Sequence, residues 1–172
     1  EFFTLDEFVK EFSLEHLHKK QPAFDRKKLD YLNGYYLRQK TDDQLFPLFQ
    51  KFLPDASSDQ IKILVPVLKE RITKLSDLVD QTKFLFKDVD YDKDLLLKKG
   101  TDSKIAVDML TKVRELISSD FSGLQDKIMK LIQDNNWNIG EFFMVFRVAI
   151  CGSAFTPPVV DCLPALGQER TL

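Results

Sequence analysis

The sequence predicts an all-α fold, and three features support this prediction. Apolar residues recur at three- and four-residue intervals along most of the 172 residues, which is the spacing of helices with one buried face. Capping residues precede these periodic segments, and glycine or proline follows several of them. No internal repeat or low-complexity segment interrupts the pattern. We therefore expect about ten short helices that pack into a bundle or cage.

The first half of the chain is expected to form a series of capped helices. Thr4 and Glu7 have the spacing of a capping box, and Asp25 can cap the third helix. Gly34 lies inside that helix and indicates close approach of another backbone, with a packed helix preferred over a ligand. Pro66 removes an amide donor inside a later helix and should kink it. The expected helices cover residues 5–12, 13–20, 25–38, 42–52, 57–72 and 74–83.

The second half is expected to continue in helices after one ambiguous stretch. Residues 84–89 could be extended, and an acidic, turn-like piece follows them. We therefore place a subdomain boundary here, which divides the chain into residues 1–83 and 84–172. The helices expected beyond it cover residues 92–99, 101–118, 122–132, 142–151 and 156–167, with Ser122 capping the third of them.

A sharp corner is predicted near the carboxyl end. The apolar run 142–151 contains Arg147, and Gly152 after it is a left-handed helix stop. Thr156 and Pro157 then form a helix start, an N-cap hydroxyl followed by a residue that needs no amide partner. The first amides of this last helix should lie beside Arg147. A helix N-terminus together with an arginine favours an anionic ligand.

Composition limits how the protein could bind a partner. A net charge of −2 and a pI of about 5.8 exclude nucleic-acid binding by bulk positive charge, so RNA binding would need a local patch. Cys151 and Cys162 stand in apolar runs, which favours buried thiols in a reducing cytosol over a disulfide or metal pair. No basic leader and no bilayer-length apolar run is present, so a cytoplasmic protein without membrane contact is expected. Because Glu1 stands where an initiator methionine would, the chain could be a fragment.

The patterns of common catalytic and metal sites are missing, so no catalytic residue, cofactor or metal is expected in this chain. His16 and His18 are two positions apart and would face different sides of a helix, which does not suit metal binding. Neither a Gly-rich phosphate loop nor a nucleophile elbow occurs. The acidic residues at 88, 90 and 92 lack the glycine and distal glutamate of a calcium loop, and a solvated turn is expected there.

Two parts of the sequence resemble one family. The first part is FDRKKLDYLNGYYLR at residues 24–38, and the second combines RVAICGS at 147–153, TPP at 156–158 and LGQER at 166–170. Together they resemble the anticodon-binding region of bacterial glutamyl-tRNA synthetases. The resemblance implies an all-helical, two-subdomain cage that binds tRNA(Glu) as a monomer and binds neither DNA nor a membrane. The family's ATP-site signatures, His-Ile-Gly-His and Lys-Met-Ser-Lys-Ser, do not occur. This implies that the chain alone does not aminoacylate, and that ATP and Mg²⁺ belong to the full enzyme.

The resemblance also assigns residues to the reading of the anticodon. Arg71 matches the arginine that reads the third anticodon base, and its planar guanidinium can donate twice to one base edge. Arg147 matches an arginine that lies against an anticodon base. The corner where the first base docks is matched by Thr156, Pro157, Val159 and Val160.

Each of these assignments has a plainer alternative. Arg71 could be a surface arginine paired with Glu70 or Asp77, and Arg147 could cap nearby carbonyl groups. The corner could be an ordinary capped turn.

Basic residues outside the corner are expected to contact the tRNA backbone, which positions RNA without specifying its sequence. A solvated charged face is the alternative for most of them. The chain departs from the family at Met129, where a basic residue can occur, and at Val160, where an aromatic residue can occur. The expected backbone contacts are Lys27, Lys28, Arg38 and Lys130.

The main alternative function is a helical scaffold that binds protein partners without RNA. The absence of an internal period argues against a scaffold of the solenoid kind. A small helical enzyme is a further alternative, and the missing catalytic patterns argue against it.

Overall fold

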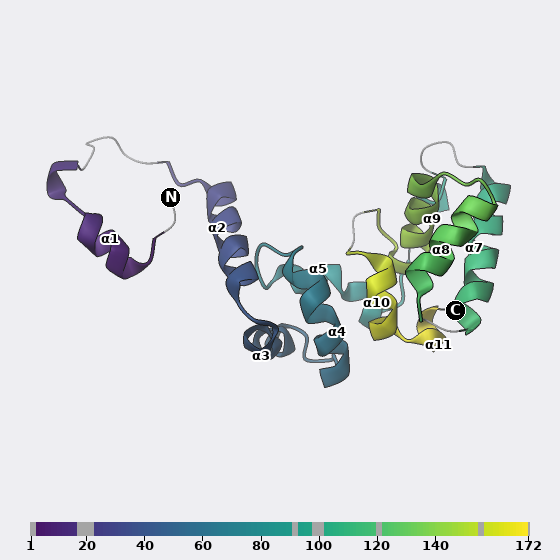
Figure 1. Ribbon diagram of the computed structural model, residues 1–172, viewed down its shortest axis with the longest axis horizontal. Helices are drawn as coiled ribbons and strands as arrows, with labels where there is room; N and C mark the ends of the chain where they lie inside the picture. The colour runs from purple at the N-terminus through teal and green to yellow at the C-terminus, as the bar shows by residue number, and fades with distance from the viewer. Residues whose placement is uncertain are drawn as a thin grey trace.

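The computed structural model describes residues 3–16, 23–90, 93–97, 102–119, 122–154 and 157–171, and within them all regular structure is helical (Figure 1). The predicted all-α fold is therefore confirmed. Two 3₁₀ turns, Leu14–His16 and Lys93–Leu95, accompany the α-helices. The α-helices are α1 (Leu5–Glu11), α2 (Arg26–Gln39), α3 (Asp42–Phe52), α4 (Ser58–Lys69), α5 (Asp77–Gln81), α6 (Lys83–Phe86), α7 (Ser103–Ser119), α8 (Leu124–Asp134), α9 (Ile139–Cys151), α10 (Val159–Leu166) and α11 (Gln168–Thr171).

The helices follow one another along a long axis, and α10 lies between the two ends (Figure 1). α1 and α2 stand at one end, whereas α7, α8 and α9 gather at the other. α10 packs on α4, which in turn packs on α3, and α10 also contacts α9 and α11. A helix from near the end of the chain therefore joins the first and second halves of the molecule.

Local capping explains where several of the helices begin. The predicted capping box of Thr4 and Glu7 is present, and the Asp25 side chain accepts bonds from the first amides of α2. α3 begins at Asp42 as predicted, but its cap is Thr41, whose hydroxyl accepts from Gln44 N at 3.3 Å. Such caps satisfy amides that have no partner within the helix.

The stretch predicted as possibly extended is partly helical. Lys83–Phe86 forms α6, and both Phe84 and Leu85 are buried. Neighbouring residues of a strand point to opposite faces, so a short helical turn lets both side chains enter one core. The preceding helix begins at Asp77 rather than at residue 74. The reason is that the Asp77 carboxylate accepts bonds from Thr73 N and Lys74 N, both at 3.1 Å, which holds the chain in a turn.

Three further helix ends differ from the prediction. α4 ends at Lys69 instead of residue 72, because the amides of Arg71 and Ile72 both donate to the carbonyl of Leu68 in a tightened last turn. α8 is preceded by Gly123 at a φ of 62°, not capped by Ser122. In the region predicted as helix 92–99, only the short 3₁₀ turn is present among the described residues.

The last long helix also starts later than predicted, at Val159 with Pro158 as its N-cap. A proline disfavours helical geometry in the residue before it, so Pro158 keeps Pro157 out of the helix. The predicted cap Thr156 lies outside the described residues.

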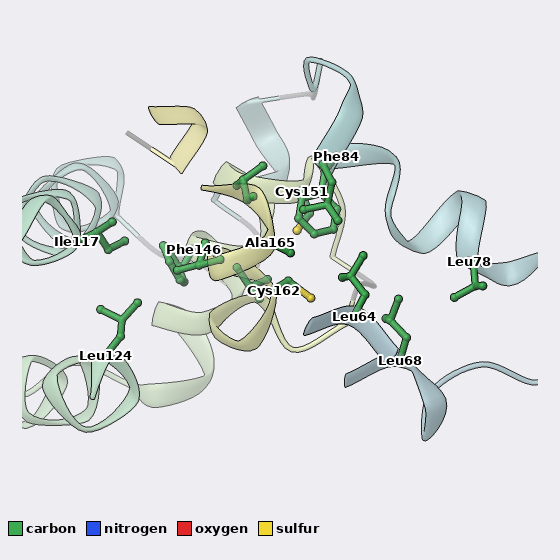
Figure 2. Close-up of a cluster of buried hydrophobic side chains, with 14 of the residues drawn as sticks. Leu64, Leu68, Leu78, Phe84, Ile117, Leu124, Phe146, Cys151, Cys162 and Ala165 are labelled. Atoms are coloured by element: carbon green, nitrogen blue, oxygen red, sulfur yellow. The ribbon is translucent and has the colours of Figure 1, made fainter. Parts of the chain in front are cut away.

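One continuous cluster of buried apolar side chains extends across the position between residues 83 and 84 (Figure 2). Leu64 and Leu68 of α4 lie beside α10, which contributes Cys162 and Ala165 to the cluster. From α10 the cluster continues into α7, α8 and α9. Gln60, on the first turn of α4, donates from Nε2 to the Ala165 carbonyl at 2.7 Å. The division into subdomains at this position remains a prediction.

At two glycines, other parts of the chain pack closely against the backbone. Gly152 ends α9 at a φ of 66°, as predicted, and a Cβ added there would overlap Val89 Cγ1. Gly34 faces Thr73, whose Cα would lie 3.4 Å from an added Cβ. The nearest atom to that Cβ would be Nη1 of Arg38, at 3.2 Å, so both neighbours of Gly34 belong to the protein itself, in agreement with the packing interpretation.

Cys151 and Cys162 are both buried and are not joined in a disulfide, as predicted. Burial raises the pKa of the Cys162 thiol to about 12 and keeps it protonated at neutral pH. Among the described helices, none combines the length and the apolar character that crossing a bilayer requires.

Candidate functional site

A pocket of about 320 Å³ brings together residues from the first and second halves of the chain. It lies where the end of α4, the first turn of α8, the middle of α9 and the start of α10 meet. Its lining residues are Arg71, Gln125, Phe143, Arg147, Pro158, Val159, Val160 and Asp161. This set contains two guanidinium groups and one carboxylate, so the lining carries net positive charge.

Arg147 is fixed in this pocket by the corner that follows α9. Its Nη1 donates to the Ala154 carbonyl at 3.2 Å, and Ala154 returns toward α9 because Gly152 reverses the chain. Its Nε is buried and has no hydrogen-bond partner within the described part of the chain. An unsatisfied buried donor costs about 1–3 kcal/mol, so a bound acceptor would stabilise this arginine. Arg147 therefore caps a carbonyl, and its Nε is left without a partner in the described structure.

Arg71 enters the pocket from the turn that follows α4. Its amide bonds to the Leu68 carbonyl at 2.8 Å, and the next residue, Ile72, is 1% exposed and anchors the turn. The alternative partner Asp77 instead accepts bonds from Thr73 and Lys74. Within the described structure Arg71 has no ion pair, and its side chain is exposed. The guanidinium is therefore available to a ligand.

The corner before α10 contributes the apolar part of the lining. Val159 and Val160 both line the pocket; Val159 is buried and also belongs to the core, whereas Val160 is half-buried. Pro157 is buried but does not line the pocket; its neighbour Pro158 does. Asp161 stands in the first turn of α10, where the helix dipole favours a negative charge.

The predicted backbone-contact residues are not gathered in one place. Lys27 and Lys28 are exposed on the first turn of α2, and Arg38 lies on its last turn. Lys130 is exposed on α8, on the far side of α4 and α10 from α2 (Figure 1). None of these residues lines the pocket.

Sequence reasoning did not single out Gln125, Phe143, Pro158 or Asp161 as pocket residues. Phe143 is one of several apolar residues in its run, and Gln125 is an ordinary polar residue of a helix. Pro158 and Asp161 flank positions that were predicted, so proximity in sequence was the only available signal for them.

Comparison with known proteins defines the class. A family model described as an anticodon binding domain matches residues 44–172. The chain therefore belongs to the anticodon binding domain family, which confirms the resemblance. It is 34% identical to the glutamate–tRNA ligase of Borreliella afzelii, an alignment that covers 99% of this chain and 38% of the relative. Its identity to glutamate–tRNA ligase 2 of Thermoanaerobacter pseudethanolicus is 32%, covering 100% of this chain and 38% of that protein.

A solved structure agrees with these sequence relatives. The crystal structure of a glutamate tRNA ligase from Elizabethkingia meningosepticum, in complex with its amino acid, superposes with a TM-score of 0.78 at 28% identity. The match covers 98% of this chain and 35% of that one. The chain thus spans well under half the length of the ligases that it resembles. These matches favour RNA recognition over the protein-binding scaffold.

Proposed function

We propose that this chain recognises the anticodon of tRNA(Glu) as part of a glutamate–tRNA ligase. The observation that carries the proposal is the pocket that Arg71, Arg147, Val159 and Val160 share, although Arg71 is far from the others in sequence. Membership of the anticodon binding domain family and the similarity to glutamate–tRNA ligases support it.

The lining of the pocket suits an unstacked base. Proteins read single-stranded RNA loops by contacting both the edges and the faces of splayed bases. The guanidinium groups of Arg71 and Arg147 supply donors for base edges. Phe143, Pro158 and Val160 supply apolar surface for a base face. The assignment of residues to bases follows the family resemblance. Arg71 would read the third anticodon base, and the corner at residues 156–160 would hold the first.

Contacts to the phosphate backbone would hold the tRNA in register. Lys27, Lys28, Arg38 and Lys130 are our candidates, and their wide separation fits a long ligand better than a small one. Because the net charge is −2, specificity would come from the pocket and not from bulk attraction.

The remaining chemistry is assigned to the rest of the ligase. In the described part of the chain, no three His, Cys, Asp or Glu side chains gather as a metal ion would require. Following the resemblance, we assign ATP, Mg²⁺ and the activation of glutamate to the portion of the ligase outside this chain. A cytoplasmic location and a monomeric state complete the proposal.

Binding of an anticodon stem-loop tests this function. The 172-residue chain should bind the tRNA(Glu) stem-loop more tightly than a stem-loop of identical stem and scrambled anticodon, at each point of a salt series. Fluorescence anisotropy with labelled RNA would measure both affinities. Equal affinities at every salt concentration would rule out anticodon reading.

A further inference from the structure

Asp161 brings a carboxylate without a described partner into the wall of the pocket. It is the third residue of α10, and it is exposed. It lines the pocket together with Arg71 and Arg147, but it forms no ion pair with either of them. Its carboxylate also accepts no hydrogen bond within the described part of the chain. The acceptor oxygens of Asp161 are therefore open to a ligand in the pocket.

The start of α10 explains why this carboxylate is unpaired. In α1, α3 and α4, the side chain of the third residue accepts a bond from the N-cap amide; these residues are Glu7, Gln44 and Gln60. Asp161 occupies the same position of α10, but the N-cap of α10 is Pro158, which has no amide hydrogen. The carboxylate therefore lacks the partner that this position usually has.

The mixture of charges in the pocket favours a base edge over a phosphate. Two guanidinium groups alone would suit a phosphate, which offers only acceptors. A carboxylate beside them repels a phosphate and needs a donor. Cytosine presents both kinds of group on one edge, an amino donor at N4 beside acceptors at N3 and O2. Uracil has a carbonyl in place of that amino group, which a carboxylate would oppose.

We propose, as an extension that rests on the proposed function, that Asp161 sets the preference of this pocket for cytosine over uracil. The carboxylate accepts from the exocyclic amine, while Arg71 donates to N3 and O2 of the same base. Glutamate codons begin with G, so the third anticodon base of tRNA(Glu), the base assigned to Arg71, is cytosine. Asp161 thereby adds a determinant for the amino group, which an arginine cannot read as an acceptor.

Two stem-loops test the proposal. They carry the tRNA(Glu) anticodon with either cytosine or uracil at its third position. The unmodified 172-residue chain should bind the cytosine form at least about tenfold more tightly. Asp161→Asn should lower this ratio at least about fivefold, because an amide can rotate to donate to the uracil carbonyl. Fluorescence anisotropy would give the four affinities, and their ratio within one variant does not depend on the folded fraction.

Asp126→Asn is the matched control. Asp126 is also the third residue of its helix, α8, and it is exposed but does not line the pocket. Both substitutions remove one negative charge from a helix N-terminus, so they have similar effects on overall attraction of RNA and on stability. Only Asp161→Asn should change the ratio between the two stem-loops. Equal changes of the ratio in the two variants would contradict the role of Asp161.

A modified base separates the contribution of Asp161 from that of Arg71. 2-Pyrimidinone keeps N3 and O2 of cytosine but lacks the amino group. At the third position it should bind the unmodified chain at least about fivefold more weakly than cytosine. Asp161→Ala should remove most of this difference, whereas Arg71→Gln should preserve it.

The possible failures of these experiments can be told apart. A preference for cytosine that survives both Asp161→Asn and Asp161→Ala would overturn the role of Asp161 and leave the proposed function standing. Equal binding of every anticodon by the unmodified chain would overturn both.

Discussion

Arg147 and Gly152 show how single residues build the pocket. Gly152 adopts a φ of 66°, which returns the chain so that the Ala154 carbonyl meets Arg147 Nη1 at 3.2 Å. The bond holds the guanidinium in place while Nε stays buried and unpaired within the described structure. A guanidinium that is already held in place loses little conformational freedom when a ligand binds.

Substitution of Arg71 should change specificity more than stability. Arg71→Gln shortens an exposed side chain and removes the planar pair of donors, so discrimination at the third anticodon base should fall by about 1–3 kcal/mol. Affinities for two stem-loops that differ only at that base would measure the loss. The melting temperature should stay within about 2 °C, since surface changes usually cost under about 0.5 kcal/mol. Unchanged discrimination would remove Arg71 from the proposed reading site.

Substitution of Gly152 should destabilise the fold strongly. In Gly152→Ala, the left-handed conformation costs about 1–2 kcal/mol, and overlap with Val89 adds about 1–3 kcal/mol. Gly123→Ala is a matched control, because its φ is 62° but no described atom lies within 4 Å of an added Cβ. Urea unfolding of both variants would separate the two costs. Equal losses of stability would show that the approach of Val89 costs nothing.

At the scale of the element, the start of α10 illustrates how neighbouring residues shift a boundary. A single Thr-Pro pair predicts a helix start, but the second proline moves the start to Val159. The shift places Pro158, Val159, Val160 and Asp161 along one wall of the pocket. The tertiary position of this wall depends in turn on α4, on which α10 packs.

The cap of α4 should contribute more to the stability of the fold than an ordinary helix cap does. Gln60 Oε1 accepts from Ser57 N at 2.9 Å, and its Nε2 reaches the Ala165 carbonyl of α10 at 2.7 Å. Gln60→Ala should therefore cost about 1–3 kcal/mol. Gln44→Ala is the control, since Gln44 makes the same capping bond, at 3.0 Å to Thr41 N, at an exposed position on α3. If chemical denaturation gave the two variants equal losses, the bond between α4 and α10 would be energetically neutral.

For the whole molecule, the continuous core has a consequence for unfolding. Buried residues of α3 and α4 belong to one cluster with those of α7 to α10. Elements that share one core lose their packing together, so a single cooperative transition is expected for the part of the chain from residue 23 onward.

Two spectroscopic probes can check this expectation. Trp137 is the sole tryptophan and packs against Phe142, so its fluorescence reports the second half, whereas far-UV circular dichroism reports all helices. The two urea midpoints should coincide within about 0.2 M. Separate midpoints would show that the halves 1–83 and 84–172 unfold independently.

Local signals in the sequence determined much of the secondary structure of this protein. Helical spacing, capping residues and the Gly152 stop predicted most helices, because each depends on residues within one or two turns. The resemblance added Arg71, Arg147, Val159 and Val160, which line one pocket. The errors, such as the possible strand at residues 84–89, arose where a short apolar run is compatible with both structures.

Only the tertiary structure decided what packs around these residues. Gln125 and Asp161 are unremarkable in sequence, and they become pocket residues because α8 and α10 converge there on the end of α4. Likewise, the periodicity of α1 predicted a buried face, whereas the fold leaves that face exposed. The physical reason is that backbone propensity acts over a few residues, whereas burial depends on which distant surfaces meet.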